Sequence, residues 1–169
     1  MLPESISRHS MKSVWWKCEF GHSWKDMISR RAIEHSGCRY CQNEFKSVLP
    51  QLLIMLYCSQ RGLKVELSNE SRLGVLIDAY IPELKLAINT IEARTKRVDD
   101  TWRVTKHLCE KRGIVLYQIS VNNTADLICM EVKRAIQSGN VFIVSDGAND
   151  IETAWEKFLL LKRKKGDGK

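Results

Sequence analysis

The chain has few residues that break or link structure, and it has no long apolar run. Its 169 residues include three prolines and nine glycines, which excludes a collagen-like repeat and a long flexible linker. No stretch approaches the ~20 consecutive apolar residues that a membrane span needs. The first residues, Met1 to Ser5, lack the basic and apolar regions of a signal peptide. We therefore expect an intracellular, cytoplasmic protein with no membrane partner.

Aliphatic residues are scarce in the first part of the chain, and the hydrophobic pattern changes near Glu44. The length suits one domain plus a small module. We expect a module at residues 10–43, a larger domain at 44–160 and a basic tail at 161–169. The formal net charge is +7, from 27 Lys and Arg against 20 Asp and Glu, and the tail alone carries five positive charges. This excess favours an anionic partner such as nucleic acid.

Three of the six cysteines lie in the module, and the spacing C-x3-H, then C-x2-C, predicts a metal site. The expected ligands are Cys18, His22, Cys38 and Cys41, supplied by two short knuckles. Zinc prefers four such ligands in a tetrahedron, and a closed four-ligand site is structural rather than catalytic. Binding of Zn²⁺ would supply the stability that burial of so few aliphatic side chains cannot. His35 is a competing ligand, but it lies in no knuckle.

The other three cysteines lie in apolar runs. We expect Cys58, Cys109 and Cys129 to be small buried side chains, without a disulfide framework.

The module resembles a family of zinc-ribbon domains found in bacterial, plant and phage proteins. The family pattern is W-x-C-x-x-G-H-x-W, an arginine, then G-C-P-x-C. Residues that fit it are Trp16, Cys18, Gly21, His22, Trp24, Arg30 or Arg31, Gly37, Cys38 and Cys41. Arg39 stands in the place of the proline. The resemblance implies a partnership with nucleic-acid enzymes.

Basic residues alternate with aromatic residues in the module. Lysines and arginines of this kind contact phosphates, and aromatic rings stack on bases. The alternative is a scaffold whose charges only face solvent. The candidates for nucleic-acid binding in this region are Lys17, Lys25, Arg30, Arg31 and Arg39.

After the module, the hydrophobic pattern predicts helices and strands in the order α-β-β-β-α-β, then α-β-α. The first helix covers 44–57 and starts near Ser47, because a proline such as Pro50 fits the first turn. Strands follow at 63–67, 73–81 and 86–91, then a helix at 99–112 and a strand at 114–119. Thr124 caps a helix that ends near 137, 141–144 is a strand, and Asn149 or Asp150 caps the last helix. The predicted fold class is α/β (α+β).

This order suits the core of the PD-(D/E)xK nucleases. Residues 74–88, with the text G-V-L-I-D-A-Y-I-P-E-L-K-L-A-I, resemble endonucleases related to very-short-patch repair enzymes. Residues 106–116 resemble a second stretch of the same family. The resemblance implies a restriction-endonuclease-like fold over 44–120 and Mg²⁺ or Mn²⁺ at Asp78.

A tight connection centred between Glu83 and Leu84 would place Asp78 directly opposite Asn89, on the same face of the sheet. Two carboxylates there would bind Mg²⁺, which prefers oxygen ligands. Asn89 stands where the second carboxylate is expected, and Ile91 stands in the place of the lysine. Glu92 would point to the other face of a regular strand.

Other candidates for catalysis remain. Glu44 opens the first helix, where this fold often has an acidic residue. Lys106 and His107 lie on the helix after the sheet.

We interpret the chain first as a zinc-containing DNA-binding protein with an endonuclease-like domain whose catalysis is lost or weakened. Basic residues near the sheet edge, Arg94, Lys96, Arg97 and Arg103, would then follow the nucleic-acid backbone. The second interpretation is an active Mg²⁺-dependent endonuclease or nickase of a phage or mobile element. The third is a protein-interaction subunit or inhibitor of a nucleic-acid machine.

Overall fold

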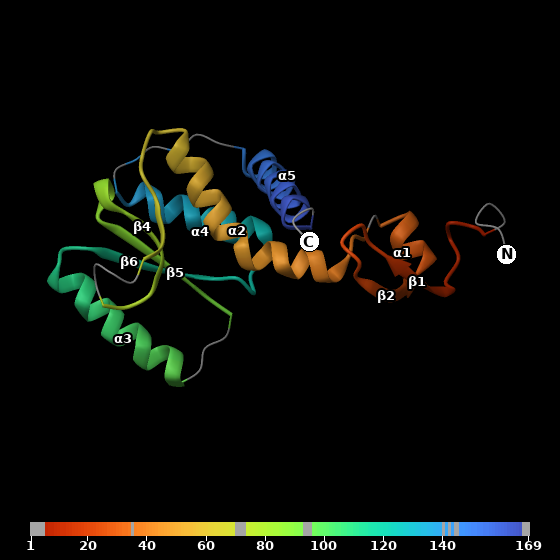
Figure 1. Ribbon diagram of the computed structural model, residues 1–169, viewed down its shortest axis with the longest axis horizontal. Coiled ribbons are helices and arrows are strands. Elements are labelled where there is room, and N and C mark those ends of the chain that lie inside the picture. The colour runs from red at the N-terminus through yellow and green to blue at the C-terminus, as the bar shows by residue number, and fades with distance from the viewer. Residues whose placement is uncertain are drawn as a thin grey trace. The chain divides into compact units, whose positions relative to one another are not determined.

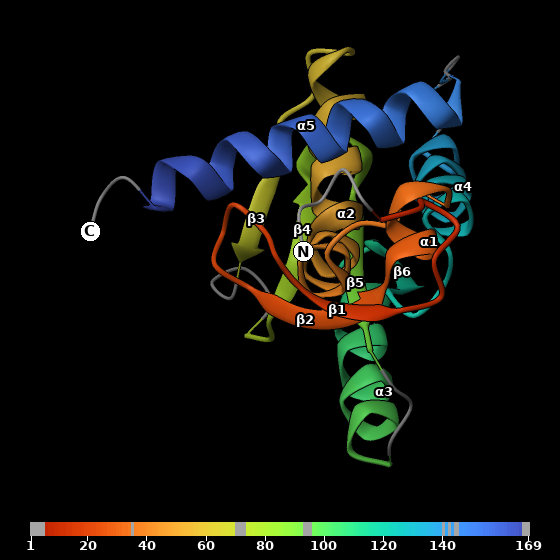
Figure 2. The same cartoon turned by 90° about the vertical axis from the view of Figure 1, so that its right-hand side faces the viewer.

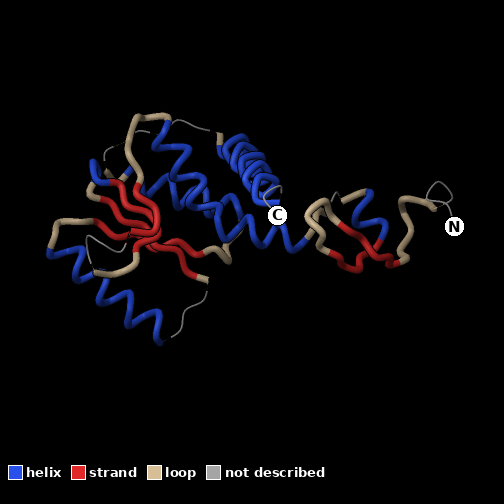
Figure 3. The backbone as a smooth tube through the Cα atoms, in the orientation of Figure 1, coloured by secondary structure: helices blue, strands red, loops and turns tan. Residues whose placement is uncertain are grey.

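The computed structural model describes residues 6–34, 36–69, 74–92, 96–139, 141, 143 and 146–166. Helices and strands are mixed, and the strands form two separate sheets (Figures 1 and 3). The chain divides into two units. The finger unit contains the described residues of Met1–Phe45 and Leu160–Lys169, and the sheet unit contains those of Lys46–Leu159.

The strands are β1 Ser13–Lys17, β2 Ser23–Met27, β3 Glu66–Asn69, β4 Ile77–Ile81, β5 Leu86–Ile91 and β6 Val115–Ser120. The α-helices are α1 Ile28–Ala32, α2 Arg39–Ser59, α3 Lys96–Lys111, α4 Ala125–Gln137 and α5 Gly147–Gly166.

The sheet unit contains four strands in the order β3-β4-β5-β6 (Figure 2). The first three are antiparallel, and β6 runs parallel to β5 after the crossover helix α3. The predicted register between β4 and β5 is confirmed, because Ala79 pairs with Ile88 and Ile81 with Leu86. A 3-10 turn over Pro82–Leu84 and Lys85, at φ 49°, make the tight connection.

Helices cover both faces of this sheet. α3 lies on one face, and α2 and α4 lie on the other (Figures 1 and 2). Under α3, Cys109 joins a buried cluster with Ile77, Tyr80, Ala87 and Ile114. The predicted order α-β-β-β-α-β is therefore present in this unit.

A buried polar cluster ties α2, α4 and α5 together within the sheet unit. The hydroxyl of Tyr57 donates a hydrogen bond of 2.7 Å to Oδ2 of Asp150 and lies 3.0 Å from Sγ of Cys129. Nζ of Lys133 lies 3.5 Å from the same carboxylate oxygen. Since burial raises the pKa of Cys129, this thiol is protonated at neutral pH, and the cluster is held by hydrogen bonds and one ion pair.

Two predicted helix starts are wrong. α2 begins at Arg39 rather than near Ser47, and Pro50 lies in its interior. Proline removes one main-chain donor, but buried side chains such as Leu49 and Leu53 on this helix offset that loss. The last helix begins at Gly147, and Asp146 caps it by accepting a hydrogen bond from the main-chain N–H of Ala148.

Strand positions also differ from the prediction. β3 covers Glu66–Asn69 rather than 63–67, because its pairing with β4 aligns Leu67 with Ala79. β4 begins at Ile77 rather than at 73. The strand expected at 141–144 lies partly outside the described residues, as 142 and 144 are not described. The helix capped by Thr124 is confirmed, since its side chain accepts a hydrogen bond from the N–H of Leu127.

Candidate metal centre and nucleic-acid interface

The first two candidate ligands lie at the turn of the β1–β2 hairpin. The main-chain N–H of Cys18 donates to the carbonyl of His22 at 3.0 Å, and that of Gly21 donates to the carbonyl of Cys18. Gly21 has φ 84°, a left-handed conformation that strongly favours glycine. The turn therefore places the thiol of Cys18 and the ring of His22 on one side of the hairpin.

The second pair belongs to a helix, and the prediction of a second short knuckle is wrong. Cys38 directly precedes α2, and Cys41 lies in its first turn. The carbonyl of Cys38 accepts the hydrogen bond of the N–H of Gln42. The start of a helix carries a partial positive charge, which favours thiolates over thiols. Both sulfur atoms are thus supplied by one rigid element.

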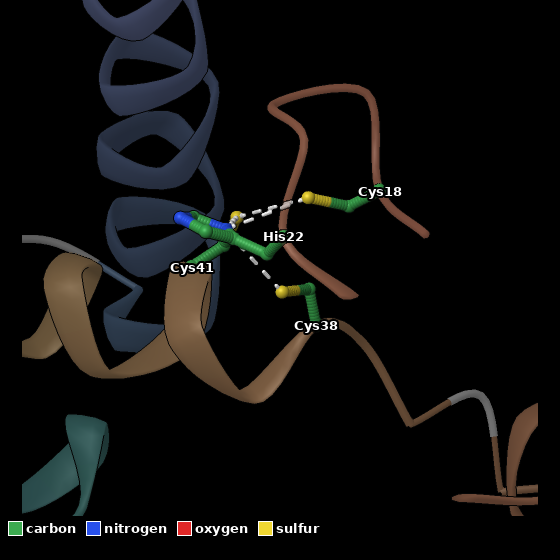
Figure 4. A group of neighbouring side chains, drawn as sticks. All are labelled: Cys18, His22, Cys38 and Cys41. Carbon is green, nitrogen blue, oxygen red and sulfur yellow. Dashed lines mark hydrogen bonds between the residues drawn. The ribbon is translucent and has the colours of Figure 1, made fainter. Parts of the chain in front are cut away.

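The four ligand atoms lie at distances that fit one zinc ion. Nδ1 of His22 lies 3.5, 3.6 and 3.4 Å from Sγ of Cys18, Cys38 and Cys41, respectively. Sγ of Cys18 lies 3.9 Å from that of Cys41 (Figure 4). A tetrahedron with Zn–S of about 2.3 Å and Zn–N of about 2.0 Å separates its ligand atoms by about 3.5–3.8 Å. The cluster is therefore a Cys₃His site suited to structural Zn²⁺.

The thiols differ in their readiness to ionise. Burial raises the pKa of Cys41 to about 12, and the neighbouring thiols of Cys38 and Cys18 add to this effect. Burial also opposes ionisation of Cys18, but hydrogen bonds from the main-chain N–H groups of His22 and Phe20 lower its pKa overall. A bound cation would supply the charge that makes three adjacent thiolates stable.

A second layer of side chains surrounds the ligands. Since Nδ1 of His22 faces the sulfur atoms, its Nε2 is free to face Glu44, whose Oε1 lies 3.5 Å away. Such a carboxylate fixes the ring orientation of a metal-binding histidine. Glu44, a candidate for catalysis in the sequence, is thus placed beside the zinc site in the finger unit.

The last turns of α5 complete this layer, which the sequence did not predict. Nζ of Lys162 lies 3.6 Å from Sγ of Cys41, contacts the Glu44 carboxylate and lies 4.8 Å from the ring centre of Phe20. Partial burial opposes the charge of Lys162, but Glu44 and Cys41 raise its pKa overall. Arg163 forms a two-pronged ion pair with Glu19, at 3.2 Å to each oxygen.

The N-terminal segment matches a known family. Residues 1–44 match the family described as "Probable Treble clef zinc finger domain". No curated protein and no solved structure matches the chain. The segment is therefore a treble-clef-like zinc finger rather than the expected zinc ribbon, in agreement with ligands shared between a hairpin and a helix start. In the described part of the chain, no helix is both long and apolar enough to span a membrane.

Only part of the predicted basic surface lies open. Trp15 is 74% exposed on β1 and pairs directly with Lys25 of β2. Lys17 is two residues further along β1, so its side chain lies on the same face of the hairpin. No carboxylate in the described part of the chain pairs with either lysine. We call Trp15, Lys17 and Lys25 the hairpin face.

The two predicted arginines of the finger have partners within it. Arg30 lies 3.7 Å from Asp26 and 3.6 Å from Glu34. The guanidinium of Arg31 lies over the rings of Trp16 and Trp24, at 5.1 and 5.3 Å from their centres. Arg31 therefore holds the hairpin against the loop before α2, where it also donates to the carbonyl of Ser36.

In the sheet unit, Asp78 and Asn89 lie side by side but are engaged with the protein. Oδ2 of Asp78 accepts hydrogen bonds from the main-chain N–H of Thr90 at 2.6 Å and from its hydroxyl at 2.8 Å. The amide of Asn89 accepts from the main-chain N–H of Asp78 at 3.2 Å. These side chains replace ladder hydrogen bonds where β4 separates from β5.

The other predicted site residues are scattered. Lys106 is exposed and pairs with Glu110 at 3.9 Å, while His107 and Arg103 are exposed on α3. Arg97 lines a cleft next to β5. Arg94 and His35 lie outside the described residues, as does the side chain of Lys96. In the part of the chain that is described, the zinc ligands are the only group of three or more His, Cys, Asp or Glu side chains placed to hold a metal ion.

Proposed function

We propose that this chain is a zinc-dependent nucleic-acid-binding protein, with DNA as its main partner. The exposed hairpin face carries the proposal. A tryptophan such as Trp15 loses free energy by remaining in water unless a partner covers it. Beside it, Lys17 and Lys25 offer two unpaired positive charges. An exposed ring between cations is the arrangement that stacks on an unpaired base while the cations contact its phosphates.

The remaining charge supports this choice of partner. The formal net charge of +7 attracts a polyanion at long range, and the attraction weakens as salt increases. In the finger, however, Arg30 and Arg31 are neutralised or occupied by other side chains. We therefore assign the contacts with nucleic acid to the hairpin face alone.

The direct test is fluorescence anisotropy with a labelled single strand, a duplex and an RNA strand, using the zinc-loaded full chain. Trp15→Ala should weaken binding to the single strand about tenfold, since stacking is worth about 1–3 kcal/mol per base. Trp15→Tyr retains a ring and should retain most of the affinity. An unchanged affinity in Trp15→Ala would overturn the proposal.

A matched pair of double variants separates local contact from net charge. Lys17→Ala with Lys25→Ala should lower both the affinity and the slope of log K against log salt by about two contacts. Lys64 and Lys157 are exposed in the sheet unit, so Lys64→Ala with Lys157→Ala makes the same change in charge away from the hairpin face. Equal losses in the two pairs would mean that only total charge matters.

We further propose that the sheet unit derives from a nuclease of the very-short-patch repair type and that its catalysis is lost. The support is the engagement of Asp78 by Thr90 and the neutral Asn89 beside it. The zinc-loaded protein should not nick supercoiled plasmid in Mg²⁺ or Mn²⁺. Nicking that disappears in Asp78→Ala would instead establish an active endonuclease. A chain with no affinity for any strand at low salt would favour a protein partner.

A further inference from the structure

A cleft of about 450 Å³ lies in the sheet unit, between the end of β5, the first turns of α3 and the middle of β6. In Figure 1, α3 lies along the face of the sheet that carries these strands. Sites for small organic ligands commonly measure about 300–1,000 Å³. The cleft also lies toward the carboxyl ends of two parallel strands, where open α/β sheets bind ligands.

Two amide side chains face this cleft from neighbouring strands. Asn89 and Gln118 are paired in the parallel register of β5 and β6. They follow Ala87 and Leu116 by two positions, and those residues pack against Cys109 of α3. Because strand side chains alternate, both amides lie on the α3 face.

The Gln118 amide is the hydrogen-bonding group that the fold leaves unused. Asn89 is bonded to the main chain of β4, but Gln118 is half-buried and has no hydrogen-bond partner in the described ranges. Polar groups in such positions normally bond to protein, water or a ligand. An amide presents a donor and an acceptor side by side, which matches the edge of a nucleobase.

α3 contributes a ring and a cation to the same cleft. The ring of Trp102 is half-buried there, and Arg97 is exposed without a carboxylate partner among the described residues. The hydroxyls of Thr101 and Thr105 donate to carbonyls of their own helix, so they do not compete for Arg97. Apart from Arg97, the only charged side chain that lines the cleft is that of Glu92, which makes its lining neutral overall.

A neutral lining with an amide and an aromatic ring does not suit a metal ion or a chain of phosphates. We infer that the cleft binds one nucleobase, with Gln118 bonded to its edge, Trp102 against its ring and Arg97 near its phosphate. A free nucleotide and an unpaired base of a strand share this chemistry. The site is separate from the hairpin face, so it goes beyond the proposed function.

The test titrates the ¹⁵N-labelled, zinc-loaded full chain with AMP, GMP, CMP and TMP in separate experiments, up to about 10 mM, since ligands of this size often bind with Kd near 1 mM. The signal is the indole N–H of Trp102, assigned by its absence in Trp102→Phe. At least one nucleotide should shift this signal saturably. Gln118→Leu should weaken that binding about tenfold, because the variant keeps the volume but loses the amide.

Two further variants make the outcome decisive. Arg97→Ala should weaken binding of the monophosphate but not of the matching nucleoside. Gln118→Glu keeps the shape of the side chain and replaces its donor by an acceptor, so it serves if Gln118→Leu does not fold. Trp15→Ala should leave the Trp102 shift unchanged while it weakens strand binding, so a failure of the hairpin face and a failure of the cleft are distinguishable.

The absence of a saturable shift with all four nucleotides and with a mixed-sequence single strand would overturn the inference, as would equal affinity in the wild type and both Gln118 variants. The source of the base follows from one comparison. A shift by the single strand, but not by a strand of abasic residues, identifies a base of nucleic acid. A shift by mononucleotides alone identifies a free nucleotide.

Discussion

The finger unit and the sheet unit are held together by different forces. Few side chains are buried in the finger, and two of these, Cys38 and Cys41, are zinc ligands. The sheet unit buries a continuous set of aliphatic side chains such as Leu49, Ile88 and Ile136. Burial of a large apolar side chain contributes about 1.5–3 kcal/mol, so the sheet unit has a sufficient core and the finger has not. Zinc therefore determines whether the finger is folded, but not whether the sheet is.

Removal of zinc should separate the two units most clearly. A strong chelator should unfold the finger, because structural zinc contributes about 10–16 kcal/mol in small domains. In ¹⁵N spectra, the indole signals of Trp16 and Trp24 should collapse to unfolded positions while the sheet unit keeps its dispersion. Zinc added back should restore them. Loss of both sets of signals together would show that the sheet unit also depends on the metal.

A pair of cysteine variants sharpens the same contrast. Cys38→Ala should abolish zinc binding, measured by metal content after gel filtration, because it removes one of the four ligands. Cys109→Ala should leave zinc binding intact and lower the free energy of unfolding of the sheet unit by about 1–2 kcal/mol, since Cys109 is fully buried under α3. A loss of zinc in Cys109→Ala would contradict the separation of the units.

Tyr57→Phe tests the polar cluster of the sheet unit. The change removes the hydrogen bond of 2.7 Å to Asp150, whose carboxylate is only 7% exposed. Hydrogen bonds to charged groups contribute about 1.5–3 kcal/mol, so thermal unfolding of the sheet unit should reveal a loss of about 2 kcal/mol. Tyr117→Phe on β6 is the control and should cost under about 0.5 kcal/mol. Zinc affinity should be unchanged in both variants, and a change in either would link the cluster to the finger.

Local spacing was enough to predict parts of both units. The tight connection at Pro82 defined which residues of β4 and β5 lie opposite each other, and the cysteine spacing selected residues that the fold brings together. Both features depend on residues that are close in the chain. They are therefore readable from turn geometry and ligand chemistry alone.

Features that depend on distant parts of the chain were missed. Nothing near Cys41 indicates that Lys162, far along the chain, contacts its sulfur atom. The segment 161–169 was predicted as a tail because its charges obscure the helical pattern that continues from Phe158. The hydrogen bonds of Asp78 to Thr90 also follow from the exact place where β4 leaves β5, which β-propensity does not determine.

The smallest expected effect concerns the link between α5 and the zinc site. Zinc with three thiolates and a neutral histidine carries a net charge of −1, and the ammonium group of Lys162 beside Cys41 partly neutralises it. Lys162→Met keeps most of the side-chain volume and removes the charge and the N–H donor. Loss of such an outer contact typically weakens metal affinity 10–100-fold, and we expect about tenfold here because the Cys41 contact is long.

Competition with a chromophoric chelator measures that loss, and Lys164→Met, an exposed lysine two residues further along α5, is the matched control. Cobalt offers a second measurement, because the sulfur-to-metal charge-transfer band reports the electron density on the thiolates and should shift to lower energy when Lys162 no longer donates to Cys41. A merely structural role for Lys162 would lower the unfolding temperature of the finger without moving this band. Equal zinc affinity and identical bands in the two variants would mean that α5 contributes nothing to the metal centre, and that the finger is complete within residues 1–44.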